Sequence, residues 1–207
     1  ELPFTVFKPS GLTSAKILSG QAKTPSQKKE YQEFKNRLWN LFSLANEMGV
    51  PVLVDAEDYA YQDHIDALVE EAMQNFNKSE PLVYHTLQMY RTDRIDYLWR
   101  LIQKARSHSY YLGIKLVRGA YMEKERMRAK EGGYPSPILP DKSATDAAYD
   151  DALKIIVENR DVISLINATH NEKSNYLLAE LMRINKLENM DKRYYFAQLY
   201  RMSDHIS

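Results

Sequence analysis

Side chains that could do chemistry cluster at or just after the ends of six short apolar runs. They are Lys8, Asp55, Glu57, Gln88, Lys115, Arg118, Tyr121, Thr169, His170, Asn171, Gln198 and Leu199. A strand buried on both faces has little use for a polar side chain except near its exposed end. Single members have plain structural explanations: Lys8 and Asp55 could pair with each other, and His170 could be an oriented, unreactive histidine. Taken together, the set predicts a functional site.

The residue types narrow the chemistry of this site. Lys8, Lys115, Arg118 and the run 169–171 form a cationic, hydrogen-bonding set that suits a phosphate or a carboxylate of a ligand. None of the five histidines has H-x-x-x-H or H-E-x-x-H spacing, so no metal centre is expected. The sequence has no cysteine and no G-x-S-x-G motif, which leaves nucleophilic hydrolysis without support. Because side chains alone transfer hydride poorly, redox chemistry here would require a bound cofactor.

The apolar runs are expected to be strands that carry these side chains. They cover residues 2–7, 51–54, 82–87, 112–117, 162–168 and 194–199. Near-continuous apolar runs of this length are typical of parallel strands covered on both faces. We expect their carboxyl ends, and therefore the polar side chains, to lie at one edge of the sheet.

Segments with helical periodicity lie between these runs. Thr24, Pro25 and Gln27 predict a capping box with proline at the first helical position, opening a helix that ends at Gly49. Apolar residues with helical spacing predict further helices within 65–76, 95–105, 148–156 and 175–186.

Alternating strands and helices predict an α/β protein. A doubly wound nucleotide-binding sheet is disfavoured because neither G-x-G-x-x-G nor a P-loop is present. A β/α barrel is favoured instead, since barrels place functional residues at the carboxyl ends of many successive strands. We find no domain linker, so residues 1–207 are expected to form one barrel-like domain.

The composition excludes several other classes of protein. Lys plus Arg and Asp plus Glu are 28 each, so the formal charge is zero and nucleic-acid binding is disfavoured. No apolar run approaches the roughly 20 residues that span a bilayer. The first residues lack the basic and apolar regions of a signal peptide, which predicts an intracellular domain.

The sequence at the end of the apolar run 112–117 resembles a motif of a known family. Leu116-Val117-Arg118-Gly119-Ala120-Tyr121, preceded by Lys115, is similar to the L-V-[RK]-G-A-Y signature of proline dehydrogenases. Five more segments resemble that family's motifs in family order: 6–12, 54–57, 86–90, 168–171 and 196–200. The resemblance therefore covers nearly the whole chain.

The resemblance implies a distorted (β/α)8 barrel, of which about six strand–helix units are evident. It implies an FAD-dependent oxidoreductase of proline catabolism that oxidises L-proline to Δ1-pyrroline-5-carboxylate by hydride transfer to flavin N5 and passes the electrons to a quinone. It further implies bacterial cytoplasm with peripheral membrane contact, or the mitochondrial matrix and inner membrane. No metal and no nucleic acid are implied.

The resemblance also assigns roles to residues. Lys8 and Asp55 would hold or adjoin the proline carboxylate, Lys115 would lie beside flavin N5, and Tyr121 and Leu199 would form an apolar wall around the substrate ring. The residues expected to contact FAD are Asp55, Gln88, Lys115, Val117, Arg118, Gly119, Ala120, Lys142, Thr169, His170 and Asn171. The segment with Lys142, just before Thr145, resembles the contacts at the adenine end, and the run 169–171 would border the ribityl and phosphate groups.

The family pattern is incomplete after the sixth strand. The seventh and eighth strands and the final helix, which carries a pair of arginines that clamp the proline carboxylate, have no counterpart before Ser207. We therefore expect the C-terminal part of the barrel to be missing from this sequence. Two alternatives stay open: a hydroxyproline dehydrogenase, and a catalytically inactive barrel that serves as an interaction or regulatory module.

Overall fold

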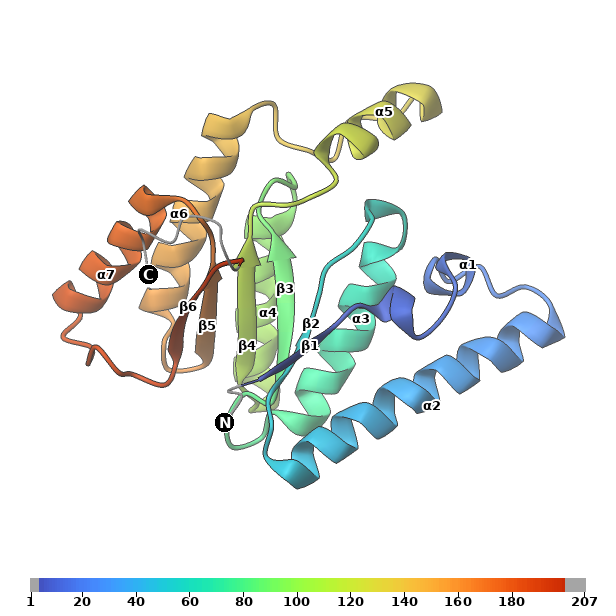
Figure 1. Ribbon diagram of the computed structural model, residues 1–207, viewed down its shortest axis with the longest axis horizontal. Coiled ribbons are helices and arrows are strands. Elements are labelled where there is room, and N and C mark those ends of the chain that lie inside the picture. The colour runs from blue at the N-terminus through green and yellow to red at the C-terminus, as the bar shows by residue number, and fades with distance from the viewer. Residues whose placement is uncertain (1–3, 200–207) are drawn as a thin grey trace. The chain divides into compact units, whose positions relative to one another are not determined.

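The computed structural model describes residues 4–199, and strands and helices alternate along them (Figure 1). The strands are β1 (Thr5–Phe7), β2 (Val52–Val54), β3 (Val83–Gln88), β4 (Leu112–Val117), β5 (Ile163–Ala168) and β6 (Tyr194–Ala197). The helices are η1 (Pro9–Gly11), α1 (Ala15–Leu18), α2 (Pro25–Met48), α3 (Tyr59–Phe76), α4 (Arg94–His108), α5 (Met122–Gly132), α6 (Lys142–Glu158) and α7 (Glu172–Ile184). The strands are hydrogen-bonded in the order in which they follow one another in the sequence.

The chain divides into two compact units. Unit 1 contains the residues up to Thr86 together with His108–Gly113, and unit 2 contains Leu87–Ser107 and the residues from Ile114 onward. β3 and β4 contribute residues to both units.

Unit 1 is built on parallel strands, three α-helices and the short 3₁₀ helix η1. β1 pairs with β2, and β2 pairs with β3, so that Leu53 lies opposite Val6 on one side and Tyr84 on the other. Helix α2 packs against α1 and α3. Its buried residues Phe34, Leu38 and Phe42 recur every four positions, which places them on one face of the helix.

Both ends of α2 follow from local sequence. The Thr24 hydroxyl accepts a hydrogen bond from the backbone N–H of Gln27, and the Gln27 side chain accepts one from the backbone N–H of Thr24. This capping box satisfies two donors that the helix itself leaves without partners. Gly49 ends the helix in the left-handed conformation, with φ of 64°. The predicted helix is confirmed at both termini.

Unit 2 has its own core. β5 and β6 are parallel, with Leu165 opposite Tyr194, and α6 packs on β5 and on α7. Ile114 and Leu116 of β4, together with Leu165 and Ile166 of β5, are buried. Tyr149 of α6 is fully buried in the same unit.

The predicted strands match those observed, with ends that differ by a few residues. β1 begins at Thr5, since Phe4 is not in a strand, and residues 2 and 3 of the predicted run lie outside the described part of the chain. The polar residues fall where they were expected: Lys8 follows β1, Asp55 follows β2, Gln88 ends β3 and Arg118 follows β4. Sequence periodicity did not indicate α1 or α5. α1 has only four residues, and α5 buries only two side chains and so lacks an apolar stripe.

Candidate functional site

The segment after β4 is shaped by a glycine. Gly119 has φ of 133°, a conformation that other residues rarely adopt, and a Cβ atom there would lie 2.5 Å from ring carbons of Tyr90. The backbone N–H groups of Met89 and Tyr90 donate to the carbonyls of Val117 and Arg118. The chain after β4 is therefore fixed against the chain after β3, and only glycine fits at position 119.

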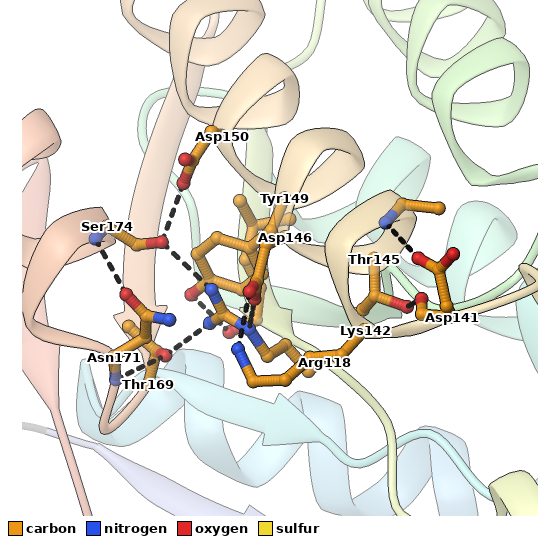
Figure 2. A network of polar contacts seen from close by, with 12 residues as sticks. Arg118, Asp141, Lys142, Thr145, Asp146, Tyr149, Asp150, Thr169, Asn171 and Ser174 are labelled. Atoms are coloured by element: carbon orange, nitrogen blue, oxygen red, sulfur yellow. Dashed lines mark hydrogen bonds and ion pairs between the residues drawn. The ribbon is translucent and has the colours of Figure 1, made fainter.

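Arg118 extends from this segment into a network of polar contacts (Figure 2). Its Nε donates to Asp146 Oδ1 at 2.6 Å, Nη1 donates to Thr169 Oγ1 at 2.5 Å, and Nη2 donates to Ser174 Oγ at 2.9 Å. The Cζ atom lies 4.4 Å from the centre of the Tyr149 ring, a cation–π distance. Three hydrogen bonds and one ring contact thus fix both the position and the plane of the guanidinium.

Two carboxylates of α6 hold this network from one helix. Asp146 Oδ2 accepts from Lys142 Nζ at 2.5 Å, while its other oxygen binds Arg118. Partial burial acts to raise the pKa of Asp146, but hydrogen bonds from Lys142 and Arg118 outweigh that effect, so the pKa is lowered. Asp150, one helical turn later, accepts from Ser174 Oγ at 2.6 Å.

The start of α7 completes the network. Asn171 caps the helix by accepting from the backbone N–H of Ser174, and its own N–H donates to Thr169 Oγ1 at 3.1 Å. Thr169 and Ser174 therefore bind Arg118 from a turn that is itself held by hydrogen bonds. Of the residues expected at the site, Arg118, Lys142, Thr169 and Asn171 are brought together.

Tyr149, whose ring contacts Arg118, is itself held by hydrogen bonds. Its hydroxyl lies 2.7 Å from Asn167 Oδ1 and 3.2 Å from the carbonyl oxygen of Leu116. Burial raises the pKa of Tyr149, so the phenol stays protonated and can donate. We did not predict Tyr149, Asp146, Asp150 or Ser174 as members of this site. Their spacing on α6 and α7 could have indicated that they share a helix face. Polar residues that face solvent have the same spacing, so it does not identify a site.

Lys8 and Asp55 form a separate pair in unit 1. The Lys8 ammonium lies 3.3 Å from Asp55 Oδ2, and the two side chains are 53% and 20% exposed. Lys8 and Asp55 therefore pair with each other, which is the structural explanation that the sequence offered for these two residues. Next to them, Glu57 is buried and accepts hydrogen bonds from the backbone N–H and the hydroxyl of Ser10.

A buried polar chain leads from Glu57 into the core of unit 1. The backbone N–H of Glu57 donates to Gln62 Oε1 at 2.7 Å, and Gln62 Nε2 donates to Asp66 Oδ1 at 2.7 Å. Asp66 Oδ1 lies 3.0 Å from His85 Nε2. Sequence reasoning missed this chain as well. A signal was present, because Gln62 and Asp66 are one turn apart on a helix and lie beside its apolar stripe.

Comparisons with known proteins show the family of this chain. A family model described as proline dehydrogenase matches residues 9–207. The chain is 36% identical to human mitochondrial proline dehydrogenase 1 over 187 residues, which are 89% of this chain and 31% of that protein. It is 35% identical over its full length to 54% of the carbapenem antibiotics biosynthesis protein CarD of Pectobacterium carotovorum subsp. carotovorum.

The chain belongs to the proline dehydrogenase family. Among solved structures, proline utilization A from Bdellovibrio bacteriovorus, inactivated by N-propargylglycine, superimposes with a TM-score of 0.85 at 24% identity, covering 97% of this chain and 20% of that one. A second proline utilization A structure, with proline bound in remote sites, gives 0.83 at 22% identity. These likenesses confirm the α/β fold of a distorted TIM-like barrel. The chain spans about a third to about half of the length of these curated relatives.

The resemblance implies FAD for this family, and unit 2 fits such a group. Gln88 is 3% exposed, and its buried Oε1 has no hydrogen-bond partner among residues 4–199. Nδ1 of His170 is also buried and has no hydrogen-bond partner among these residues. Its Nε2 accepts a long hydrogen bond, 3.4 Å, from the backbone N–H of Leu199. Buried polar atoms without partners are costly, so a ligand with hydrogen-bonding groups would offset this cost.

The structure also places Lys115, Tyr121 and Leu199. Lys115 and Tyr121 are half-buried at the end of β4 and at the start of α5, and Leu199 is 67% exposed. Their roles stay predictions. Within the described part of the chain no cluster of side chains could hold a metal ion, and no helix has the length and hydropathy to cross a membrane.

Proposed function

We propose that the protein oxidises L-proline to Δ1-pyrroline-5-carboxylate with FAD as its cofactor. One observation carries this proposal. Arg118 of the L-V-R-G-A-Y segment is fixed in a polar network at the end of β4, and Lys142 binds the same carboxylate, Asp146. A guanidinium has five N–H donors. Three have partners among the described residues, so two are left for an anionic ligand.

Unit 2 would hold the cofactor. FAD, when bound, accepts the hydride that proline loses, and with it two electrons. Arg118 and Lys142 would bind its anionic phosphates, while Thr169, His170 and Asn171 would border the neighbouring polar groups. Gln88 would offer its unused amide oxygen to an N–H donor, and the backbone of 117–120 would line the ring.

A cation at Lys115 would favour the reduced cofactor, because it acts where negative charge develops. In unit 1, Lys8 would bind the substrate carboxylate, with Asp55 nearby. Tyr121 and Leu199 would form the apolar wall that orients the substrate ring. Oxidation takes a hydride from C5 of proline and a proton from its nitrogen and leaves a C5=N double bond; no described residue is an evident base, so the proton would pass to solvent.

A quinone would receive the electrons, and peripheral contact of the protein with a membrane would bring the protein to the quinone. The relatives include mitochondrial proteins and a bacterial one, which supports either the mitochondrial matrix and inner membrane or the bacterial cytoplasm as the location.

The test uses the full-length natural protein under anaerobic conditions. The purified protein should show flavin absorbance, and added L-proline should bleach it while forming Δ1-pyrroline-5-carboxylate. Bleaching by 4-hydroxyproline, with none by L-proline, would favour a hydroxyproline dehydrogenase. A protein that takes up no FAD would overturn the proposal in favour of an inactive module.

A further inference from the structure

Asp146 contacts both cations of unit 2 that are proposed to bind phosphate. One carboxylate oxygen binds Arg118 Nε at 2.6 Å and the other binds Lys142 Nζ at 2.5 Å (Figure 2). The Arg118 and Asp146 side chains are 20% and 28% exposed, whereas the Lys142 side chain is 75% exposed. The carboxylate therefore joins an anchored guanidinium to an ammonium that has few other restraints.

The anchoring of the two cations is unequal. Arg118 is held by Thr169, by Ser174 and by the ring of Tyr149 in addition to Asp146. For Lys142, Asp146 is the only hydrogen-bond or ion-pair partner within residues 4–199. Losing the carboxylate would thus leave Arg118 nearly in place and release Lys142 into solvent.

The position of Lys142 in its helix needs an explanation. It is the first residue of α6, directly after the cap Asp141, and the first turn of this helix carries no acidic residue. A cation at this end is unfavourable, because the helix dipole places positive charge there. A residue that breaks a local rule often has a functional reason. Here the i,i+4 contact with Asp146 offsets part of this cost and points Lys142 toward Arg118.

We propose that Asp146 is a positioning residue that holds Lys142 beside Arg118, so that the two cations bind the anionic phosphates of the dinucleotide together. The inference rests on the proposed function of unit 2 as the FAD site. The Asp146 carboxylate lies between the two cations and weakens their mutual repulsion, so both can stay close enough to bind one anion.

A rival explanation makes the opposite prediction. If Asp146 only occupied the place of a phosphate, it would compete with the cofactor, and its removal would strengthen FAD binding. The positioning role predicts that removal weakens binding, because Lys142 would lose its fixed location and pay the cost of ordering when the ligand arrives.

The experiment measures FAD affinity of the full-length natural apoprotein by quenching of flavin fluorescence. Asp146→Asn keeps the shape and removes the charge, and it should weaken FAD binding about tenfold, as expected for one charge-assisted hydrogen bond. Riboflavin, which has no phosphate, should bind the variant and the wild type with equal affinity. A general loss of structure would weaken both ligands, so the pair of ligands separates positioning from damage to the fold.

Two further variants test the route through Lys142. Lys142→Met should weaken FAD binding by a similar factor, and the double variant should be within about twofold of Lys142→Met, because contacting residues are not additive. Asp151→Asn is the matched control. Asp151 lies on the same helix, pairs with Lys154 and is 59% exposed, so this change should leave FAD binding within twofold of the wild type.

The outcomes are distinct. Unchanged or tighter FAD binding by Asp146→Asn overturns the positioning role, and so does an additive double variant. A wild-type protein that binds no FAD overturns the proposed function itself, whatever the variants do.

Discussion

The two units hold their proposed site residues in different ways. In unit 2, the guanidinium of Arg118 is itself fixed, by hydrogen bonds to three side chains and a ring below it. In unit 1, the buried contacts fix the backbone: Glu57 binds Ser10 and is held by Gln62. The ion pair of Lys8 with Asp55, at 3.3 Å, is solvent-exposed.

The difference suggests a division of labour. A side chain whose orientation is fixed before binding loses little entropy when it meets its ligand, which suits a cofactor that stays bound. An exposed lysine keeps its freedom and can exchange partners, which suits a substrate that enters and leaves at each turnover. The following predictions would break or sharpen this contrast.

The largest effect is expected for Arg118→Met, which removes the centre of the unit 2 network. FAD binding should weaken about 100-fold, because a charged hydrogen-bonding group is lost and the partners of Arg118 are left without it. Arg106→Met is the control, since Arg106 pairs with Asp161 on the surface of the same unit. Fluorescence titration with FAD measures both, and equal affinities for the two variants would show that the network does not serve the cofactor.

Glu57→Ala should affect stability more than binding. It removes the acceptor of two hydrogen bonds from Ser10, at a cost of about 2 kcal/mol in the free energy of unfolding. Glu71→Ala breaks the exposed contact with Lys35 and should cost less than about 1 kcal/mol. Denaturant unfolding of the two variants tests the contrast; equal losses would mean that Glu57 is no special anchor.

Acid should lower the stability of unit 2 at Asp93, a carboxylate that accepts hydrogen bonds from two arginines. Burial acts to raise the pKa of Asp93, but hydrogen bonds from Arg94 and Arg91 outweigh it and lower the pKa to about 2. The stabilisation is present above the unfolded-state pKa of about 4 and is lost as the pH falls from there toward 2. Because Asp93 is half exposed, we expect about 1 kcal/mol at most.

Unfolding of the wild type and of Asp93→Asn, measured across this pH range, checks the sign. The variant should be less stable at neutral pH and should lose less stability on acidification. An identical pH dependence in both proteins would exclude Asp93 as the group responsible.

The smallest change in stability is expected for Lys8→Met. Its ion pair with Asp55 is solvent-exposed, which predicts a loss of less than about 0.5 kcal/mol in unfolding free energy. FAD content should stay at the wild-type level, while the KM for L-proline should rise. Loss of FAD from this variant would contradict the division of labour between the units.

The sequence was informative where one element decides the outcome. The apolar run 112–117 gave β4 with both ends correct, and Thr24 with Gln27 gave the start of α2, because caps and strands are local. Polar residues at strand ends also pointed to Arg118 and Thr169, since a buried strand rarely carries them elsewhere.

Residues that depend on packing between elements could not be predicted in the same way. Asp146 and Asp150 have the spacing of ordinary solvent-facing carboxylates, and only the packing of α6 on β5 and α7 brings them toward Arg118 and Ser174. The polar chain from Gln62 to His85 likewise requires the strand next to its helix. Such contacts arise from tertiary structure, which periodicity does not encode.

Hydrogen–deuterium exchange of the full-length natural apoprotein, with and without FAD, tests most directly whether unit 2 holds the cofactor. The account predicts that FAD slows exchange in peptides covering 116–121, 141–150 and 168–175, and leaves α2 of unit 1 unchanged. Binding of FAD without protection in these three segments would contradict it.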